Sequence, residues 1–443
     1  MAETYLIENA KVISGGEHSQ LPVLVEGDRI VAVGEQAKTS ANPDVNRIDG
    51  TDCTLIPGMV DAHCHISFDQ PRSNDELFFH RRPGLATVIA AVNAQKMLRA
   101  GVTSFLDPDC IFDVGIDLRD AIDGGVVEGP RMATGGNVLI TCVGGTAGQL
   151  LPSEGKLGYA VIVQTKDEIV REIRKQIKGG CDWIKVHVTG LPVRRTKRHN
   201  PGEIQSWSLD ELRLVCDTAH ALGVPVVGHC RNSSSTRDAA LAGFDLIFHS
   251  SYMGEDALEA VVDNNTPLAP SFTFLRNLVD YGDKINSDPG LKKIFMNEIE
   301  ATSAMIRRAY DAGVPLMCGT ESGFSITPYG DWHYREMGIY VEHLGLTPLQ
   351  AIACGTEAGA RIFGLEDELG RIEPGYIADL VLVAGDLEKD LNLLGEKSNI
   401  RAVFKGGKKI DLSRPLPDSW SIPGWRTGQF SNQVLTYELA HSY

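Results

Sequence analysis

The chain has 443 residues, of which 43% are hydrophobic and 23% charged, and its formal net charge is −16. This length exceeds one typical hydrophobic core, so a catalytic domain plus a second module is expected. The composition excludes a disordered chain. The acidic balance argues against nucleic acid and anionic membranes as partners.

The cysteines and the N-terminal residues indicate the cellular compartment of such a protein. Nine cysteines without paired spacing are typical of reduced thiols rather than a disulfide framework. The sequence has no run of about 20 apolar residues and no N-terminal segment of the secretory kind. We therefore expect a cytoplasmic protein with a small-molecule partner and no membrane contact.

Both ends of the chain contain short apolar runs joined by Gly and Asp turns, which predicts β-hairpins. These runs fill residues 1–55 and recur in 368–410. Neither end can bury a core alone, so we expect the two to combine into one small β-sandwich. The tail, 411–443, carries Pro and aromatic residues and is expected to wrap either the central domain or a neighbouring subunit.

The segment 55–65 is a short apolar run that ends in His63 and His65. On a strand, residues i and i+2 point to the same face, so the two imidazoles aim at one point. Two converging neutral imidazoles make half of a zinc-type site. A single pair of histidines at this spacing is weak evidence for a metal site, and its weight depends on further candidate ligands downstream.

Four later apolar runs place a metal-compatible side chain in or at the end of a predicted strand. The side chains are Lys185 in 182–186, His229 in 224–229, His249 in 244–249 and Glu321 in 314–321. Helix-like stretches at 209–222 and 298–312 precede two of these runs. Strands alternating with helices predict an α/β fold, and in a closed (β/α)8 TIM barrel over 56–367 the site lies at the carboxyl ends of the strands. A snorkelling lysine or a core histidine explains each residue singly, but not all five strand ends together.

With these residues in place, the chain resembles the metal-dependent amidohydrolase superfamily. The phrases around Ile56–Asp61 and Gly375–Val381 agree with it, and the likeness spans roughly Tyr5 to Lys409. Within the superfamily the chain is similar to the branch of imidazolonepropionase-like enzymes, Xaa-Pro dipeptidases and bacterial hydrolases of small amides, carbamates and ureas. The resemblance implies a TIM barrel plus a β-sandwich formed by both ends.

The resemblance also implies a mechanism. Lys185 would be carbamylated by CO2 and bridge two divalent ions, zinc being the best fit, although manganese, cobalt and iron suit such ligands too. His63 and His65 would hold one ion with Glu321, and His229 and His249 the other. A hydroxide between the ions, formed because bound water has its pKa lowered to about 7, would attack the acyl carbon of a C–N bond. Glu321 would then carry the proton to the leaving nitrogen.

Two positions depart from the family pattern. The family usually has aspartate where this chain has Glu321, and the extra methylene moves the carboxylate by about 1.5 Å. A misplacement of ~1 Å can cost on the order of a hundredfold in rate, so the residue is either an adaptation or an impairment. Thr146 stands where related dipeptidases often carry a histidine. His187, on the Lys185 face of its strand, and Tyr252 are the candidates for the carbonyl-orienting role.

The sequence predicts substrate contacts less sharply. Arg231 and the basic cluster 194–198 could clamp a carboxylate, as a dipeptidase requires. The loops also supply aromatic residues: Phe68, Phe78, Phe79, Phe272, Phe274, Phe324, Tyr329 and Trp332. We take Arg231, Thr146, Phe324 and Trp332 as candidate substrate contacts. The aromatic supply slightly favours an aryl amide, carbamate or urea over a dipeptide.

Three other classes fit less well. A mononuclear deaminase of the superfamily usually lacks the lysine and has a glutamate shortly after the fifth-strand histidine, where this chain has Cys230 and Arg231. A non-catalytic descendant is supported only by Glu321. A Rossmann enzyme needs a Gly-x-Gly-x-x-Gly turn that is not found here. We expect a homo-oligomer, although no residue shows it.

Overall fold

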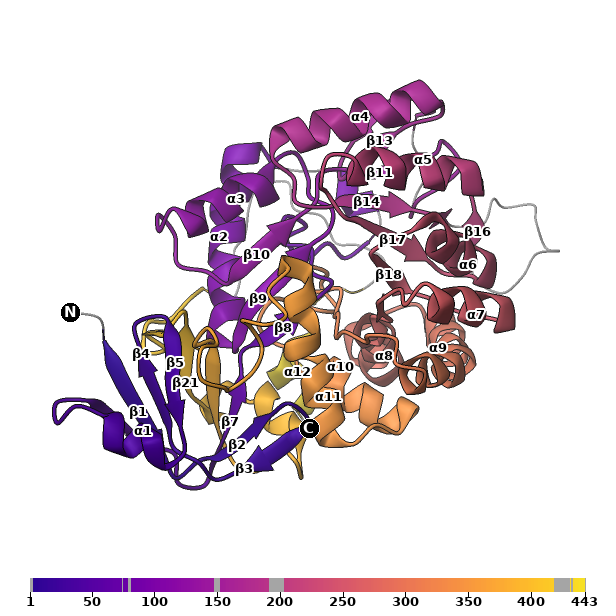
Figure 1. Ribbon diagram of the computed structural model, residues 1–443. Coiled ribbons are helices and arrows are strands. Elements are labelled where there is room, and N and C mark those ends of the chain that lie inside the picture. Colours follow the sequence, from indigo (N-terminus) through magenta and orange to yellow (C-terminus); the bar gives the residue numbers. More distant parts are fainter. Residues whose placement is uncertain are drawn as a thin grey trace.

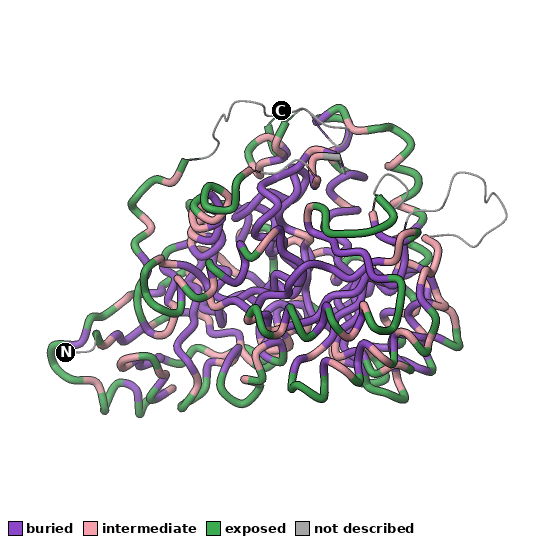
Figure 2. Tube along the Cα trace, turned by 90° about the horizontal axis from the view of Figure 1, so that it is seen from above, coloured by how far each residue is buried: buried purple, intermediate pink, exposed green. Residues whose placement is uncertain are grey.

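The computed structural model describes residues 3–73, 75–78, 81–146, 152–190, 203–417, 431 and 433–442. In Figure 1 the β-rich part at the lower left contains both early and late segments, and parallel strands with their helices fill the upper right. Figure 2 shows the buried trace concentrated at the centre of the molecule, with exposed segments at its edge. None of the helices in these ranges combines the length and apolarity that a membrane crossing requires.

The β-rich part has two sheets, of which the six-stranded one draws strands from both ends of the chain. The four-stranded sheet has the order β5 (Arg29–Val33), β4 (Val23–Glu26), β1 (Thr4–Glu8), β6 (Asn46–Asp49). The six-stranded sheet has the order β22 (Lys408–Lys409), β21 (Ile400–Lys405), β20 (Leu380–Ala384), β7 (Cys53–Pro57), β2 (Lys11–Ser14), β3 (Glu17–Ser19). One apolar cluster contains Ile7 and Val25 from the first sheet and Leu55, Leu382 and Phe404 from the second. The short helix α1 (Glu35–Ser40) follows β5.

The parallel strands form two further groups. One has the order β10 (Arg131–Thr134), β9 (Val102–Asp107), β8 (Met59–Asp61). The other has the order β12 (Gly155–Leu157), β13 (Ala160–Ile162), β11 (Val138–Ile140), β14 (Ile184–His187), β17 (Val226–Cys230), β18 (Leu246–His249), β19 (Leu268–Ala269), and only β12 is antiparallel. In β14 and β17 the partners Lys185 and Val227 are in register, as are His187 and His229. This register sets the side chains of neighbouring strands beside one another.

Single parallel bridges connect the edges of the two groups. The bridged pairs are Gly135 with Trp183, Leu268 with Leu316, and Cys64 with Ser322. The amide of Ala62 also donates to the carbonyl of Cys318 over 2.8 Å. The segment 314–322 therefore runs between β19 and β8, although it makes isolated bridges rather than the predicted strand over 314–321. A small antiparallel pair, β15 (Thr189–Gly190) and β16 (Ile204–Gln205), lies beside β14 in the sequence.

Helices connect the parallel strands: α2 (Pro83–Arg99), α3 (Val114–Asp123), α4 (Lys166–Gly179), α5 (Leu209–His220), α6 (Ser233–Ala242), α7 (Glu255–Asp263), α8 (Phe272–Tyr281), α9 (Pro289–Asp311), α10 (Arg335–Ile339) and α11 (Pro348–Cys354). Helical turns occur at η1 (Asp75–Phe78), η3 (Gly282–Ile285), η4 (Tyr340–Leu344), η5 (Glu357–Phe363), η6 (Leu391–Gly395) and η7 (Lys397–Asn399). Helices α4 and α5 each begin with a capping box. At the start of α5, the side chain of Ser208 accepts the backbone amide of Glu211, and the side chain of Glu211 accepts that of Ser208.

Two helix predictions differ from the structure at their ends. Helix α5 was predicted to reach residue 222 and ends at His220. Helix α9 was predicted from residue 298 and begins at Pro289, because Asp288 caps the first turn by accepting the amide of Gly290 and proline suits the first helical position. The early start gives α9 a long face toward the strand ends.

The described part of the tail packs against the same chain. The amide of Leu435 donates to the carbonyl of Ser325 over 2.8 Å, and the indole of Trp332 donates to the carbonyl of Leu435 over 2.7 Å. Helix α12 (Tyr437–His441) adds ring contacts to Trp332. Of the two expected positions for the tail, the structure shows the one against the chain's own central domain.

Candidate active site

A cavity of about 920 Å³ lies at the carboxyl ends of the parallel strands. All the predicted metal ligands line it: His63, His65, Lys185, His229, His249 and Glu321. They come from separate elements, since His63 and His65 follow β8, Lys185 lies on β14, His229 on β17 and His249 ends β18. Strand alternation therefore brings together side chains that are distant in the sequence.

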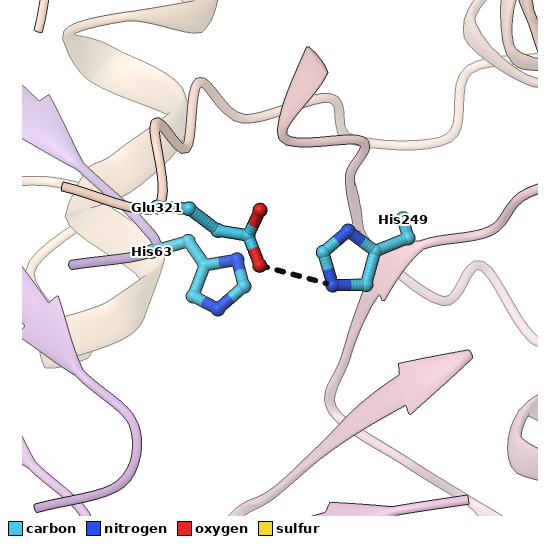
Figure 3. A group of neighbouring side chains, drawn as sticks. All are labelled: His63, His249 and Glu321. Atoms are coloured by element: carbon cyan, nitrogen blue, oxygen red, sulfur yellow. Dashed lines mark ion pairs between the residues drawn. The ribbon is translucent and has the colours of Figure 1, made fainter. Parts of the chain in front are cut away.

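Three of these residues form the tightest group of donor atoms (Figure 3). One donor atom each from His63, His249 and Glu321 lies within 4.8 Å of the others. The Nε2 atom of His249 is 3.7 Å from Oε1 of Glu321 and is buried without a hydrogen-bond partner among the described residues. A buried, unpartnered imidazole nitrogen facing a carboxylate fits a divalent cation, because an unsatisfied polar atom is costly inside a protein.

Burial keeps the imidazoles in the form that binds metal. Burial, followed by the charge of Lys185, lowers the pKa of His63 well below 6.5. Burial, followed by His229, lowers the pKa of His249 in the same way. Metal ligation needs the neutral ring, so both side chains are ready to coordinate without first losing a proton.

Lys185 is almost completely buried, and its ammonium lies 4.1 Å from the centroid of the Phe248 ring. His63 stacks on the same ring with a centroid separation of 3.7 Å. Burial lowers the pKa of Lys185 from 10.5 to about 8, against the opposing effect of Asp109 and Glu321. A buried lysine with a lowered pKa has a larger neutral fraction, which is the nucleophilic form of the amine.

Two buried carboxylates that the sequence interpretation missed hold the histidines. An oxygen of Asp109 is 2.9 Å from Nδ1 of His65, and Oε2 of Glu203 is 2.8 Å from Nε2 of His229. A carboxylate on one imidazole nitrogen orients the ring and leaves the other nitrogen for a ligand. Asp109 follows β9 just as the ligands follow their strands, so this signal was readable. Glu203 has no such signal.

Asp61 joins the loops that carry the outer ligands. Its carboxylate accepts the amides of His63 and Thr320, each over 3.1 Å, and lies 2.7 Å from Nδ1 of His333. His333 accepts the amide of Gly330 at Nε2, so its Nδ1 carries the proton that Asp61 receives. One buried carboxylate at the end of β8 thus fixes the loop before Glu321 relative to the His63 loop.

Backbone conformation is strained at the same place. The φ angles of His249, Tyr252, Ser271 and Glu321 are 67°, 55°, 57° and 52°, in the left-handed region that L-residues disfavour. Ser271 contacts Nδ1 of His63 through its hydroxyl at 2.8 Å. Such residues cost of order 1–3 kcal/mol each and cluster where function constrains the chain.

Comparison with known proteins decides the family, because the model of the amidohydrolase family matches residues 54–410. This chain belongs to the amidohydrolase family. Ochratoxinase of Aspergillus niger is 27% identical over 440 residues, covering 92% of this chain and 86% of the fungal protein. Imidazolonepropionase of Symbiobacterium thermophilum is 25% identical over 395 residues, covering 85% and 86% of the two chains.

A crystal structure of a Xaa-Pro dipeptidase with methionine bound in its active site has a TM-score of 0.78 and 25% identity, covering 92% of this chain and all of that one. The comparisons confirm the predicted family and branch, the class of hydrolases acting on C–N bonds, and a TIM-barrel-like α/β fold.

Thr146, Tyr252 and His187 line the cavity of this amidohydrolase together with the ligands. The phenol of Tyr159 donates to Oγ1 of Thr146 over 2.7 Å, which leaves the threonine hydroxyl proton able to point elsewhere. His187 stacks on His229, and its Nδ1 is buried without a hydrogen-bond partner among the described residues. These three residues therefore line the same cavity as the proposed ligands, and their carbonyl-orienting role stays a prediction.

Part of the cavity lining is apolar and aromatic. These residues are Phe68, Leu77, Tyr159, Phe274, Leu291, Ile294, Phe295 and Phe324. Phe68 stacks on His65 with a centroid separation of 4.3 Å. Phe324 packs edge-on against Phe68 and Phe274, with centroid separations of 5.5 and 5.2 Å. Three of the predicted aromatic residues thus line the cavity, and Tyr159 and Phe295 were missed.

The structure does not bring Trp332 to this cavity. Its side chain is buried against the tail, where the indole donates to Leu435, and it lies outside the described lining. Its expected substrate contact is corrected accordingly. Phe272 and Tyr329 also pack in the core, the hydroxyl of Tyr329 donating to the carbonyl of His65. Phe79 and the basic cluster 194–198 lie outside the described residues.

Arg231 lines the cavity, as predicted for a carboxylate clamp, but it is already paired. Its Nη2 lies 2.8 Å from both carboxylate oxygens of Glu298 in α9. Nε lies 4.0 Å from the carboxylate of Glu203. The predicted clamp therefore faces two acidic side chains.

Proposed function

We propose that this amidohydrolase uses two divalent ions to cleave the C–N bond of a small apolar or aryl amide, carbamate or urea. The observation that carries the proposal is the convergence on one cavity, partly lined by aromatic rings, of His63, His65, Lys185, His229, His249 and Glu321. Apolar walls with a few convergent polar groups are typical of sites for small uncharged ligands.

The donor set fits two ions, most simply zinc. In this proposal His63, His65 and Glu321 would hold one ion, His229 and His249 would hold the other, and Lys185, once carbamylated, would supply a further ligand. When bound, the ions supply an activated water and polarise a carbonyl. The low pKa of the Lys185 ammonium supports carbamylation, since only the neutral amine reacts with CO2.

Glu321 is the residue proposed to move the proton. Burial raises its pKa above the ordinary 4.5, so the carboxyl holds a proton more readily than an exposed glutamate does. It lies beside the nitrogens of His63 and His249, from which it can reach the leaving nitrogen. Tyr252, His187 and Thr146 are proposed to orient the carbonyl oxygen by donating hydrogen bonds from the cavity wall.

A second candidate is a hydrolase of Xaa-Pro or N-acyl amino acid substrates. It is favoured by Arg231 in the cavity and by the likeness to the Xaa-Pro dipeptidase structure. The finer architectural predictions, a closed eightfold barrel over 56–367 and a β-sandwich of 1–55 with 368–410, belong to the same proposal, as do a cytoplasmic location and a homo-oligomer.

The test is product formation by mass spectrometry after loading the protein with zinc and bicarbonate. The panel contains aryl ureas, aryl carbamates, N-acyl aromatic amines, and Xaa-Pro and N-acyl amino acid compounds. Turnover of uncharged aryl compounds supports the proposal, and turnover confined to carboxylate-bearing compounds selects the second candidate. Binding of two metals per chain, measured by elemental analysis, must accompany turnover, and a protein that binds none contradicts both.

A further inference from the structure

Arg231 is the cation from which the charge preference of the substrate can be derived. It lies two residues after His229, at the cavity end of β17, and its side chain is 14% exposed. Within the described lining, Lys185 is the one other lysine or arginine, and it lies among the proposed metal ligands. Arg231 is therefore the side chain with which a substrate carboxylate would form an ion pair.

Glu298 is the main partner of that guanidinium. Both of its oxygens lie 2.8 Å from Nη2 of Arg231, and the Ser251 hydroxyl donates to Oε1 over 2.6 Å. Only 4% of Glu298 is exposed. A buried carboxylate with three contacts of this quality stays in place, since separating it from its partner would leave an uncompensated charge inside the protein.

Glu203 adds a second negative charge on the other side of Arg231. Its Oε1 lies 4.0 Å from Nε of Arg231, while its Oε2 contacts His229 and the Thr189 hydroxyl, each at 2.8 Å. One guanidinium thus lies beside two carboxylates, so the surroundings of Arg231 are acidic.

The helix that carries Glu298 also supplies part of the apolar lining. Leu291, Phe295 and Glu298 of α9 all line the cavity at helical spacing, so one face of one helix supplies both features. The Phe295 ring centroid lies 5.8 Å from Cζ of Arg231. A group that packs on this face meets an aromatic ring and a neutralised ion pair.

We infer that Glu298 is a specificity-determining residue that cancels the charge of Arg231, so that the substrate group bound against α9 is uncharged. A substrate carboxylate placed there would face Glu203 and Glu298 and gain little from an arginine that is already paired. Selection against one charge state by a fixed repulsive group is a recognised source of specificity. This inference rests on the proposed function, whose choice of uncharged substrates it explains.

The test uses two amides that share an acyl group and differ by one carboxylate, N-benzoylphenethylamine and N-benzoylphenylalanine. We expect the wild-type enzyme to prefer the first. Glu298→Gln keeps the shape and the Ser251 contact but exposes the charge of Arg231. The ratio of kcat/KM for the acid to kcat/KM for the neutral amide should then rise at least about tenfold, the change that 1.4 kcal/mol produces.

The double variant Arg231→Met/Glu298→Met is the matched control, because it removes both charges and leaves no buried unpaired cation. Its ratio should stay within about threefold of wild type. Folding and metal content are checked by circular dichroism and elemental analysis. A folded, metal-loaded Glu298→Gln protein with an unchanged ratio overturns the inference, as does a wild type that prefers the acid and loses that preference in the double variant.

A binding measurement separates this inference from the proposed function. Calorimetry with 4-phenylbutanoate and 4-phenylbutanol on the metal-loaded protein needs no turnover. In Glu298→Gln, the Kd of 4-phenylbutanoate should fall about tenfold relative to the Kd of 4-phenylbutanol. If the enzyme hydrolyses neither amide but this shift is observed, the proposed reaction fails and the role of Glu298 stands. If turnover occurs without the shift, the reverse holds.

Discussion

The two halves of the cavity are built differently. The metal half is carried by the parallel strands and the segments that follow them, and two of the proposed ligands have a buried carboxylate neighbour, Asp109 beside His65 and Glu203 beside His229. The substrate half is carried by helices α8 and α9 and by loops, and apolar side chains dominate it. The contrast teaches that the reaction depends on the sheet, whereas the choice of substrate depends on elements packed over it.

Removing the central metal-half residue should have the largest effect. Lys185→Ala deletes the proposed bridging ligand, so we expect kcat/KM to fall by about 10³-fold or more and the metal content to drop below two ions per chain. Elemental analysis and steady-state kinetics measure both. Lys408→Ala, at an exposed position paired with Glu128, is the control. Full activity with unchanged metal content in Lys185→Ala would end the two-ion proposal.

Shortening the carboxylate at 321 tests whether the metal half is adapted to glutamate. Because Glu321 already reaches His249 to within 3.7 Å, we expect Glu321→Asp to withdraw it by about 1.5 Å and lower kcat about a hundredfold. Glu366→Asp on the surface serves as the control. A faster Glu321→Asp enzyme would mean that glutamate impairs this chain.

Activation of metal-free protein should depend on pH through Lys185. Because its pKa is about 8, the neutral fraction of the amine rises about tenfold per pH unit below pH 8 and levels off above pH 8. With dissolved CO2 held constant, the rate at which zinc restores activity should follow this curve. Stopped-time assays between pH 6 and 9 measure it, and a rate that falls as pH rises would contradict the assignment.

The smallest effect is expected in the substrate half. Phe295→Ala removes aromatic surface from the α9 wall, so KM for an aryl substrate should rise about tenfold while kcat stays within about threefold. A small alkyl amide that does not reach α9 is the control substrate and should show no change. A drop in kcat with unchanged KM would mean that Phe295 acts on the reaction step, and it would contradict the division of the cavity into a metal half and a substrate half.

The sequence predicts the two halves unequally. The residues predicted as ligands line one cavity because each lies in a parallel strand or just after an apolar run, and their role as ligands stays a prediction. The segment 314–321 was predicted to be a strand, but its backbone makes only isolated bridges there. Asp109 was within reach of the same reasoning.

Glu298 could not be predicted. It lies within a long helix among other polar residues, and only the position of α9 beside the segment after β17 makes it the partner of Arg231. Trp332 fails for a related reason: its loop position suggested a substrate contact, but the tail covers it. Residues whose role depends on how one element packs on another leave no local pattern to read.

The single face of α9 has a practical consequence. Leu291, Phe295 and Glu298 lie within one short stretch of the gene, while the metal ligands are spread from residue 63 to residue 321. A synthetic cassette that randomises this stretch would sample new ligand preferences without altering any codon for a metal ligand. A screen of such a library would therefore start from clones that all retain the complete set of metal ligands.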